Sequence, residues 1–288
     1  MRIGLAQMRP RLGCVEQNIE KHLQLIKKAK KEKLDLLIFP ELSLTGYHLL
    51  DLTFQVARKQ TSEAIRVLVE QADELDLLFG FVEHSSEHQL YNTAIYASNC
   101  SITHLHRKIY LPTYGMFDEA RYYGKGKTIR SFPTRFGRFG LLICEDAWHF
   151  SLPYLLIMDG AELIIVISNS PVNGVTTEEP LTRQKWKSIL TSQALVYGSH
   201  VLFVNRVGTE EGLTFYGGSF VVNPFGQMEA EASLFQEEVL IVELELDQVR
   251  QARFQTPIMR DENIHLTLQE LQRILQKQVT GEGEASGS

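Results

Sequence analysis

The sequence has 288 residues, of which 44% are hydrophobic and 22% are charged, a composition typical of globular proteins and a length sufficient to bury a large core. The formal net charge of -6 at pH 7 argues against a nucleic acid or an anionic membrane surface as a partner. No run approaches the ~18 apolar residues of a membrane-spanning helix, and the N-terminus MRIGLAQMRP is typical of a strand rather than of a signal peptide.

Hydrophobic periodicity predicts strands that alternate with helices. The predicted strands are residues 2–8, 34–39, 76–82, 90–98, 101–105, 138–144, 162–168, 200–205, 217–223 and 239–246. The predicted helices are residues 15–33, 57–72, 151–158, 181–197, 247–254 and 267–276. Several strands are continuous apolar runs, such as LDLLIF and ELIIVIS, which are typical of sheets covered by helices.

This alternation predicts an α/β fold in a single domain over residues 1–276, because no Pro-, Gly- or Ser-rich linker divides the middle of the chain. Two mixed sheets packed face to face, with helices outside both, would accommodate so many strands, although periodicity alone does not select that arrangement. Residues 277–288, which end in GEGEASGS, predict a polar and disordered tail. The three cysteines, Cys14, Cys100 and Cys144, are an odd number at scattered positions, which favours free thiols in a reducing, cytoplasmic compartment.

Three polar clusters follow apolar strands, and each contains one residue able to carry chemistry. Glu41 follows the run LDLLIF by one proline, so its carboxylate could serve as a general base or cap a turn. Lys108 precedes an apolar Ile-Tyr-Leu triplet and could hold an oxyanion or lie at a sheet edge with its charge in water. Cys144 ends the run FGLLI before two acids and could be a nucleophile or a small core side chain.

Together these residues would supply a base, a cation and a nucleophile at the carboxyl ends of strands, where ligands bind in α/β folds. A Cys-His pair through His149 is disfavoured, because five residues along a strand-to-helix turn separate it from Cys144. No HExxH or CxxC spacing occurs, so a zinc enzyme is disfavoured, and we expect neither a metal nor a cofactor.

The blocks FPELSLTGY, HRKIYLPTYGMFDEARYY and GLLICEDAWH, in this order, resemble the signature of the nitrilase, or carbon–nitrogen hydrolase, superfamily. The resemblance extends from Met1 to the strand that ends near Leu246. It implies a four-layer α-β-β-α sandwich with two mixed sheets and helices outside, and subunits that commonly form a homodimer or a higher homo-oligomer.

The resemblance also implies a role for each residue that matches the superfamily. Cys144 matches the nucleophile, and Glu41 matches the base that deprotonates it and later activates water. Lys108 matches the cation that stabilises the tetrahedral intermediate, together with the backbone N–H of Glu145. Glu119 matches a second glutamate beside the lysine. On this basis we expect Lys108 to favour the thiolate form of Cys144, while Glu41 takes the proton.

Within the superfamily, LPTYGMFDEARYY and ICEDAW most resemble the glutaminase domains of glutamine-dependent NAD synthetases. This implies that Tyr47, Glu145 and Ser170 help to hold an amide substrate, and it adds Tyr114 as a candidate contact. Glu145 could bind the α-ammonium of a glutamine-like substrate or merely cap the helix that follows Cys144, with equal weight on the two interpretations. Trp148 could line the pocket or pack against the sheet.

Two departures from those domains limit the transfer of a substrate. Few residues follow the matching region and no phosphate-binding Gly-rich loop occurs, so we expect no synthetase domain. Residues 172–182 are expected to form a longer loop that shapes the rim of the pocket.

Three functions remain open. The first is hydrolysis of a small glutamine-like or ω-amide by water. The second is hydrolysis of an N-carbamoyl compound by the same chemistry. The third is an ammonia-supplying subunit that works with a separate synthetase partner.

Overall fold

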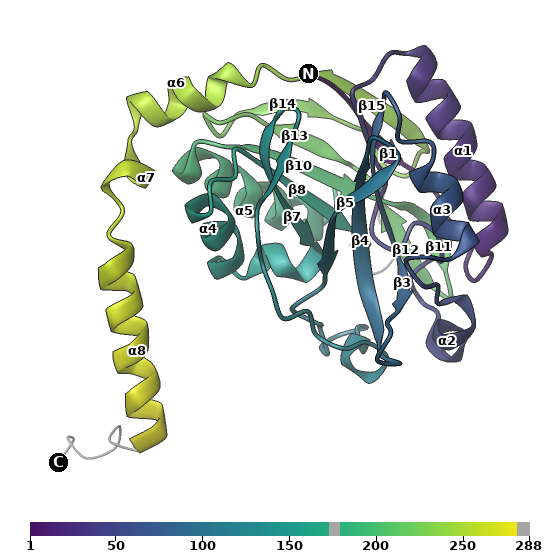
Figure 1. Cartoon of the computed structure of the whole chain (residues 1–288), viewed down its shortest axis with the longest axis horizontal. Coiled ribbons are helices and arrows are strands. Elements are labelled where there is room, and N and C mark those ends of the chain that lie inside the picture. Colours follow the sequence, from purple (N-terminus) through teal and green to yellow (C-terminus); the bar gives the residue numbers. More distant parts are fainter. Residues whose placement is uncertain (173–178, 281–288) are drawn as a thin grey trace.

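The continuous apolar runs of the sequence become the central strands of two six-stranded sheets in the computed structural model, which describes residues 1–172 and 179–280. Figure 1 shows the two sheets face to face. The first sheet has the order β15-β1-β2-β3-β4-β5 and the second the order β14-β13-β10-β8-β7-β6. A smaller sheet has the order β11-β12-β9.

The bounds of the strands and helices are as follows. The first sheet consists of β1 (Arg2–Gln7), β2 (Leu36–Ile38), β3 (Asp76–His84), β4 (Leu90–Ser98), β5 (Ser101–Arg107) and β15 (Glu238–Glu243). The second consists of β6 (Phe132–Thr134), β7 (Gly137–Ile143), β8 (Leu163–Ser168), β10 (His200–Asn205), β13 (Phe220–Val222) and β14 (Met228–Glu231). The small sheet consists of β9 (Pro171–Val172), β11 (Val207–Glu210) and β12 (Leu213–Tyr216). The helices are α1 (Val15–Lys31), α2 (Thr53–Val56), α3 (Glu63–Val69), α4 (Ser151–Met158), α5 (Leu181–Tyr197), α6 (Asp247–Gln255), α7 (Ile258–Asp261) and α8 (Ile264–Thr280).

The burial pattern of β2 shows how the layers are built. Successive side chains of a strand point to opposite faces of its sheet. Leu36 and Ile38 belong to the core between the two sheets, whereas Leu37 belongs to the core beneath α1 and α3. On the far side, α4 and α5 cover the second sheet and contribute Leu156 and Trp186 to its core. The α-β-β-α sandwich predicted from the sequence is therefore confirmed.

The strands at the centre of each sheet run parallel, which places their carboxyl ends at one edge. In the first sheet β1, β2 and β3 are parallel neighbours, and in the second β7, β8 and β10 are parallel neighbours. Glu41 comes shortly after β2, Cys144 directly after β7 and Asn169 directly after β8. The packing of the two sheets thus brings together residues that are more than 100 positions apart in the chain.

Several elements differ from their predicted bounds for identifiable reasons. The helix predicted over residues 57–72 shortens to α3, because the backbone of Arg58 instead pairs with β3 beside Glu83. The strand predicted over residues 217–223 begins only at Phe220, because Gly217 and Gly218 adopt φ values of 72° and 57° that no strand allows. The sequence analysis missed the β11–β12 hairpin and the short strands β6, β9 and β14.

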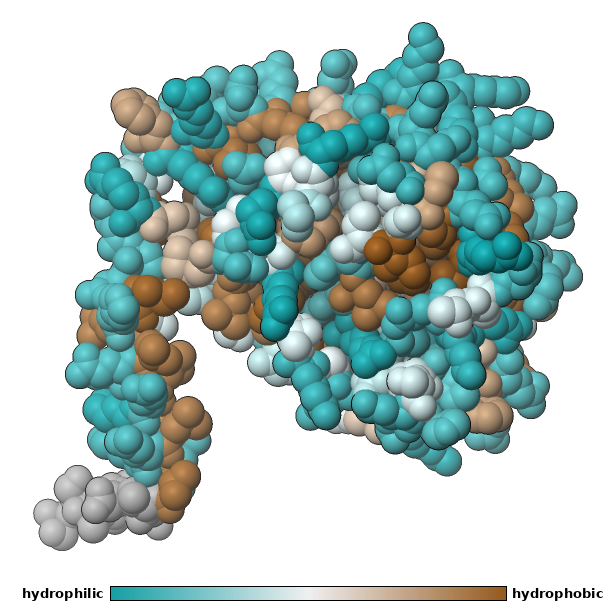
Figure 2. Space-filling view, in the orientation of Figure 1, coloured by the Kyte–Doolittle hydropathy of each residue, from teal (hydrophilic) through white to brown (hydrophobic). Residues whose placement is uncertain are grey.

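The C-terminal helix α8 extends away from the rest of the chain (Figure 1) and begins before and ends after its predicted bounds. It runs four residues beyond Gln276, where the polar tail was predicted to begin; residues 281–288 of that tail lie outside the described residues. Figure 2 shows apolar side chains along one side of α8, and Leu268, Leu271 and Leu275 on it are exposed. The predicted homo-oligomer stays a prediction.

None of the helices within residues 1–172 and 179–280 combines the length and the apolar character that a membrane crossing requires. The cytoplasmic location inferred from the cysteines stays a prediction.

Gly80 in β3 packs against the backbone of Glu41 and Leu42, which follow β2. Replacing it tests how tight this contact is. A Cβ atom at Gly80 would lie 2.6 Å from the backbone nitrogen of Leu42 and 3.2 Å from Glu41, and backbone atoms have little freedom to move aside. We expect Gly80→Ala to lower the free energy of unfolding by about 1–3 kcal/mol, measured by urea denaturation. The control is Gly4→Ala in β1, where the closest atom is the end of the Leu34 side chain. Unchanged stability of Gly80→Ala would show that this backbone contact is not tight.

Candidate active site

Cys144 sits at a sharp turn between a strand and a short helix. The strand β7 ends at Ile143, and a 3₁₀ helix spans Cys144–Trp148. Cys144 itself has a φ of 48°, a left-handed conformation that is unfavourable for a residue with a Cβ and that is often found where a side chain is presented for chemistry. Its sulfur accepts a hydrogen bond of 3.3 Å from Ser168 Oγ at the end of β8.

The buried carboxylate of Asp146 holds this turn in place. Its Oδ2 accepts a hydrogen bond from the backbone N–H of Ile143 at 3.2 Å and lies 2.8 Å from His106 Nε2. Its Oδ1 accepts hydrogen bonds from the backbone N–H groups of Ile109 and Tyr110 at 3.0 and 2.9 Å. Asp146 therefore ties the turn that carries Cys144 to the segment that directly follows Lys108.

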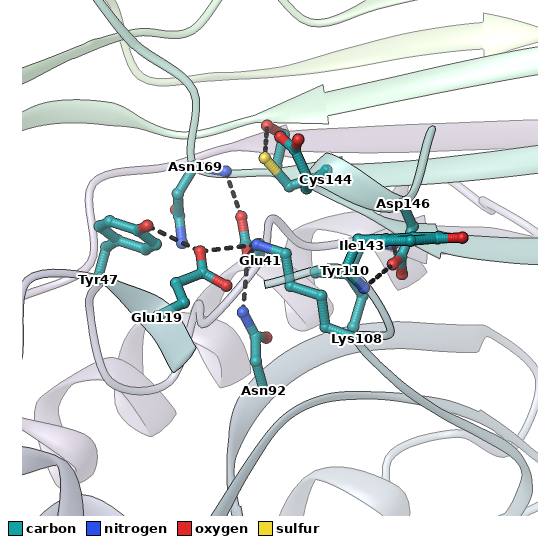
Figure 3. A network of polar contacts seen from close by, with 12 residues as sticks. Glu41, Tyr47, Asn92, Lys108, Tyr110, Glu119, Ile143, Cys144, Asp146 and Asn169 are labelled. Atoms are coloured by element: carbon teal, nitrogen blue, oxygen red, sulfur yellow. Dashed lines mark hydrogen bonds and ion pairs between the residues drawn. The ribbon is translucent and has the colours of Figure 1, made fainter. Parts of the chain in front are cut away.

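Glu41 and Lys108 form a fully buried ion pair between the two sheets (Figure 3). The Lys108 ammonium donates to Glu41 Oε1 at 2.8 Å, and the Asn92 side-chain amide donates to the same oxygen at 2.7 Å. The other carboxylate oxygen, Oε2, accepts a hydrogen bond of 2.7 Å from the backbone N–H of Asn169. Donors from β4 and from the segments that follow β5 and β8 thus orient this carboxylate.

Glu119 lies on the other side of the same ammonium group. Its Oε1 accepts hydrogen bonds from Lys108 Nζ and from the Tyr47 hydroxyl, both at 2.7 Å. Tyr47 is fixed in turn by Glu210, whose Oε2 accepts hydrogen bonds from the backbone N–H groups of Tyr47 and His48 at 2.9 and 3.2 Å. Glu210 also forms a buried ion pair with Arg206.

Burial and charge together set the protonation of this cluster. Burial alone would lower the pKa of Lys108, but Glu119 and Glu41 raise it well above its usual value, so the ammonium stays charged. Burial raises the pKa of Glu119 to about 7, against the opposing effect of Lys108 and with a further rise from Glu41. One cation thus faces two buried carboxyl groups, one of which holds a proton up to about neutral pH.

Lys108 lowers the pKa of Cys144, as the sequence led us to expect, but other effects outweigh it. Burial, and after it the Glu41 carboxylate, raise the pKa of Cys144, and Lys108 offsets only part of that rise. The loss of water and the nearby carboxylate were not foreseen from the sequence, and together they leave the pKa raised. In this structure Cys144 is a thiol at neutral pH, so its reaction as a nucleophile requires a base.

A cavity of about 220 Å³ opens beside Cys144. Its lining consists of Tyr114, Gly115, Met116, Phe117, Cys144, Glu145, Trp148, Ser170, Pro171, Thr182, Lys185 and Trp186. A larger hollow of about 780 Å³ lies between Arg9, Lys21 and Glu211, but Cys144, Glu41 and Lys108 do not line it. Within the described part of the chain, no group of three His, Cys, Asp or Glu side chains could hold a metal ion.

The structure places four of the five predicted substrate-binding residues in the wall of this cavity: Tyr114, Glu145, Trp148 and Ser170. The hydroxyl of Tyr114 donates to Glu145 Oε2 at 2.8 Å. The fifth residue, Tyr47, does not line the cavity and instead contacts Glu119. Residues 173–178 of the predicted rim loop lie outside the described residues.

Sequence reasoning gave no role to the polar residues that orient this cluster. Asn92 lies within β4, Asp146 follows Cys144 by two positions, and Ser168 and Asn169 stand at the end of β8. The serine and asparagine carried a usable signal, because polar residues directly follow the apolar run of β8 at the same edge of the sheet. Asn92 carried no such signal, because it lies inside β4 rather than at the end of a strand.

Comparison with known proteins identifies the family and agrees with the fold. The carbon–nitrogen hydrolase family profile matches residues 2–254. The glutamine-dependent NAD(+) synthetase of Acinetobacter baylyi is 33% identical over 250 residues, which cover 86% of this chain and 45% of the synthetase. A probable nitrilase of Schizosaccharomyces pombe is 26% identical over 87% of this chain and 91% of its own.

Solved structures show the same relationship. The glutamine-dependent NAD+ synthetase from Acinetobacter baumannii, in complex with ADP, has a TM-score of 0.77 and 32% identity, over 86% of this chain and 46% of that one. The carbon–nitrogen hydrolase from Helicobacter pylori has a TM-score of 0.84 and 26% identity, over 94% of this chain and 98% of that one.

This protein therefore belongs to the carbon–nitrogen hydrolase family, within the nitrilase superfamily, as the three sequence blocks predicted. It spans less than half the length of the two synthetases.

The raised pKa of Glu119 predicts a pH-dependent stability. Glu119 titrates near pH 7 in the folded protein and near pH ~4.3 in an unfolded chain. Between these values the folded state binds a proton that the unfolded state has released, so this contribution is complete at low pH and is lost as the pH rises to 7.

Glu119→Gln does not titrate and therefore lacks this contribution. We expect the unfolding free energy of the variant, relative to the wild type, to increase by about 1.4 kcal/mol for each pH unit between pH 5 and 7. Urea denaturation at pH 5, 6, 7 and 8 measures this trend. If the two proteins follow parallel curves, Glu119 has an ordinary pKa.

Proposed function

We propose that this chain is a thiol amidase that hydrolyses a non-peptide C–N bond of a small amide to a carboxylic acid and ammonia. The observation that carries the proposal is the contact of a buried Lys108 ammonium with two buried carboxyl groups, next to a cysteine presented at a positive φ in the wall of a cavity. A buried cation with two acids is costly unless its groups are well paired, so packing alone gives no reason for such a set.

In the acylation step, Glu41 removes the thiol proton as the sulfur of Cys144 attacks the amide carbonyl carbon. The negative charge that develops on the carbonyl oxygen is stabilised by the Lys108 ammonium and the backbone N–H of Glu145. Glu41 then passes its proton to the amide nitrogen, the C–N bond breaks and ammonia leaves. The product is a thioester on Cys144.

In the deacylation step, Glu41 takes a proton from a water molecule whose oxygen attacks the thioester carbon. The C–S bond breaks, and the thiolate takes the proton back from Glu41 while the carboxylic acid leaves. The raised pKa of Cys144 fits this scheme in two ways. The thiol is protonated at the start, so the first step needs a base, and the sulfur readily takes a proton again when it leaves in the second step.

The size and the lining of the cavity favour a small amide substrate that carries charged groups. Its volume of about 220 Å³ suits a molecule the size of an amino acid. Glu145 would contact an ammonium group, and Lys185 on the same wall would contact a carboxylate. Glutamine and related ω-amides carry both groups, and the similarity to glutamine-dependent NAD synthetases points to the same substrate class.

A second candidate is an ammonia-supplying glutaminase that works with a separate synthetase. It rests on the names of the relatives and on the share of their length, about 45%, that this chain matches. Hydrolysis of an N-carbamoyl compound uses the same chemistry and is the remaining alternative. An ammonia-release assay with glutamine, simple amides and N-carbamoyl compounds, repeated with candidate synthetases, separates the three.

Replacing the thiol tests the chemistry. We expect Cys144→Ala to lower the rate of ammonia release by about 1000-fold or more, because no acyl-enzyme can form. Circular dichroism should show an intact fold. The matched control is Cys100→Ala, an exposed cysteine whose replacement should leave the rate unchanged. Retained turnover in Cys144→Ala would rule out the thiol mechanism.

Replacing Glu145 tests the substrate class. Glu145→Gln should raise KM for glutamine by about tenfold or more, since it removes a charge partner of the α-ammonium, and it should change KM for butanamide little. Tyr114→Phe is the matched control, because it removes only the hydroxyl that donates to Glu145 and should have a smaller effect. Equal KM changes for both substrates would exclude an ammonium contact at Glu145.

A further inference from the structure

Ser168 presents a buried hydroxyl to the sulfur of Cys144. Its side chain has no exposure to solvent, and its Oγ donates a hydrogen bond of 3.3 Å to the sulfur. Within residues 1–172 and 179–280, this is the one hydrogen bond that the sulfur accepts, whereas Lys108 acts on the thiol through its charge. The proposed nucleophile therefore contacts a polar group to which the mechanism above gives no task.

The register of two strands creates this contact. In the parallel pair of β7 and β8, Ile143 lies opposite Ile167, so Cys144 and Ser168 take the next position of each chain segment. The other residues of β8 are leucine, isoleucine and valine, and the whole strand is buried. A hydroxyl at the end of such a strand is unfavourable unless it has a partner, and here the partner is the sulfur.

The backbone around Ser168 is held firmly. Ser168 pairs with Asn205 in the ladder between β8 and β10. The backbone N–H of Asn169 donates to Glu41 Oε2 at 2.7 Å, and that of Ser170 donates to Asn205 Oδ1 at 2.8 Å. The hydroxyl is thus in place before the reaction begins, and a preorganised donor costs no rearrangement when charge develops beside it.

The hydrogen bond from Ser168 strengthens when the sulfur becomes negative. A neutral thiol is a weak acceptor, whereas a hydrogen bond to an ionised group is roughly twice as strong as one between neutral groups. Burial raises the pKa of Cys144, and Lys108 and the hydrogen bond from Ser168 both lower it. An interaction that is stronger in the transition state than in the resting enzyme accelerates the reaction.

We propose that Ser168 is a further catalytic residue, whose hydroxyl stabilises the negative charge on the sulfur of Cys144 in both steps of the reaction. The proposal rests on the thiol mechanism described above. In acylation Glu41 takes the thiol proton while the S–C bond forms, and Ser168 stabilises the charge that the sulfur carries before the bond is complete. In deacylation the C–S bond breaks and its electron pair stays on the sulfur, where Ser168 stabilises it until Glu41 returns the proton. Ser168 keeps its own proton throughout.

The test compares Ser168→Ala, which removes only the hydroxyl, with Ser168→Thr, which keeps one. The matched control is Ser199→Ala. Ser199 is also fully buried, but its hydroxyl has no partner among the described residues, and it precedes β10 at the end opposite to Asn205. The first measurement is the rate at which iodoacetamide alkylates Cys144, which lines the cavity, at a fixed pH. Peptide mass spectrometry follows this rate, with the exposed Cys100 as the reference in the same sample.

We expect Ser168→Ala to slow the alkylation of Cys144 by about threefold or more. A weaker acid gives less thiolate at a fixed pH, and the greater nucleophilicity of that thiolate offsets only part of the loss. In the ammonia-release assay, with the amide that the wild type hydrolyses fastest, Ser168→Ala should lower kcat by about tenfold and leave KM close to the wild-type value. Ser168→Thr should recover part of both rates. Ser199→Ala, and Cys100 in every sample, should react as in the wild type.

Alkylation of Cys144 at the wild-type rate in Ser168→Ala would overturn the proposal, because the hydroxyl would then not stabilise charge on the sulfur. Faster alkylation would show that Ser168 only packs against the thiol, and a higher KM with unchanged kcat would assign it to substrate binding. The alkylation test needs no substrate, so the proposed function can fail separately. If the wild type releases ammonia from no amide while Ser168→Ala still slows alkylation, the amidase function is rejected and the stabilisation of the thiolate by Ser168 stands.

Discussion

The geometry of the site depends on one buried charge, the ammonium of Lys108. An isolated ammonium in the core would lose its proton or destabilise the fold. Glu41 and Glu119 prevent this by approaching to 2.8 and 2.7 Å. Burial raises the pKa of Glu119 to about 7, with a further rise from the second acid, Glu41, and Lys108 offsets only part of this. Burial, and after it the Glu41 carboxylate, disfavour a thiolate at Cys144, so its proton stays on the sulfur.

The face-to-face packing of the sheets makes such a cluster possible. Glu41 follows the carboxyl end of β2 in the first sheet, and Cys144 follows the carboxyl end of β7 in the second. The side chain of Lys108 lies between the two sheets. Asp146 supports this arrangement by binding the backbone on both sides, at Ile143 and at Tyr110. A shift of one sheet against the other would break these hydrogen bonds, so the fold and the site share the same constraints.

The layers of the fold and the central residues of the site could be predicted from the sequence, because they follow from local patterns. Continuous apolar runs indicate covered strands, and Glu41 and Cys144 follow two of them, whereas Lys108 follows the partly polar strand β5. The β11–β12 hairpin was missed because its pairing depends on the positive φ values of Glu211 and Gly212, which a short polar stretch did not reveal. The effect of Lys108 on the pKa of Cys144 was foreseen, but the larger effect of burial was not, because desolvation depends on the packed tertiary structure and has no sequence signature.

Glu145 lies between two residues that cannot be replaced without disturbing the site. Cys144 is the proposed nucleophile, and the carboxylate of Asp146 accepts hydrogen bonds from backbone N–H groups and lies beside His106. Glu145 lines the cavity and contacts the side chains of Tyr114 and His149 rather than the backbone of the turn. Its side chain can therefore be exchanged without moving the thiol, which makes this single position a natural place for substrate preference to drift among related proteins while the reaction stays the same.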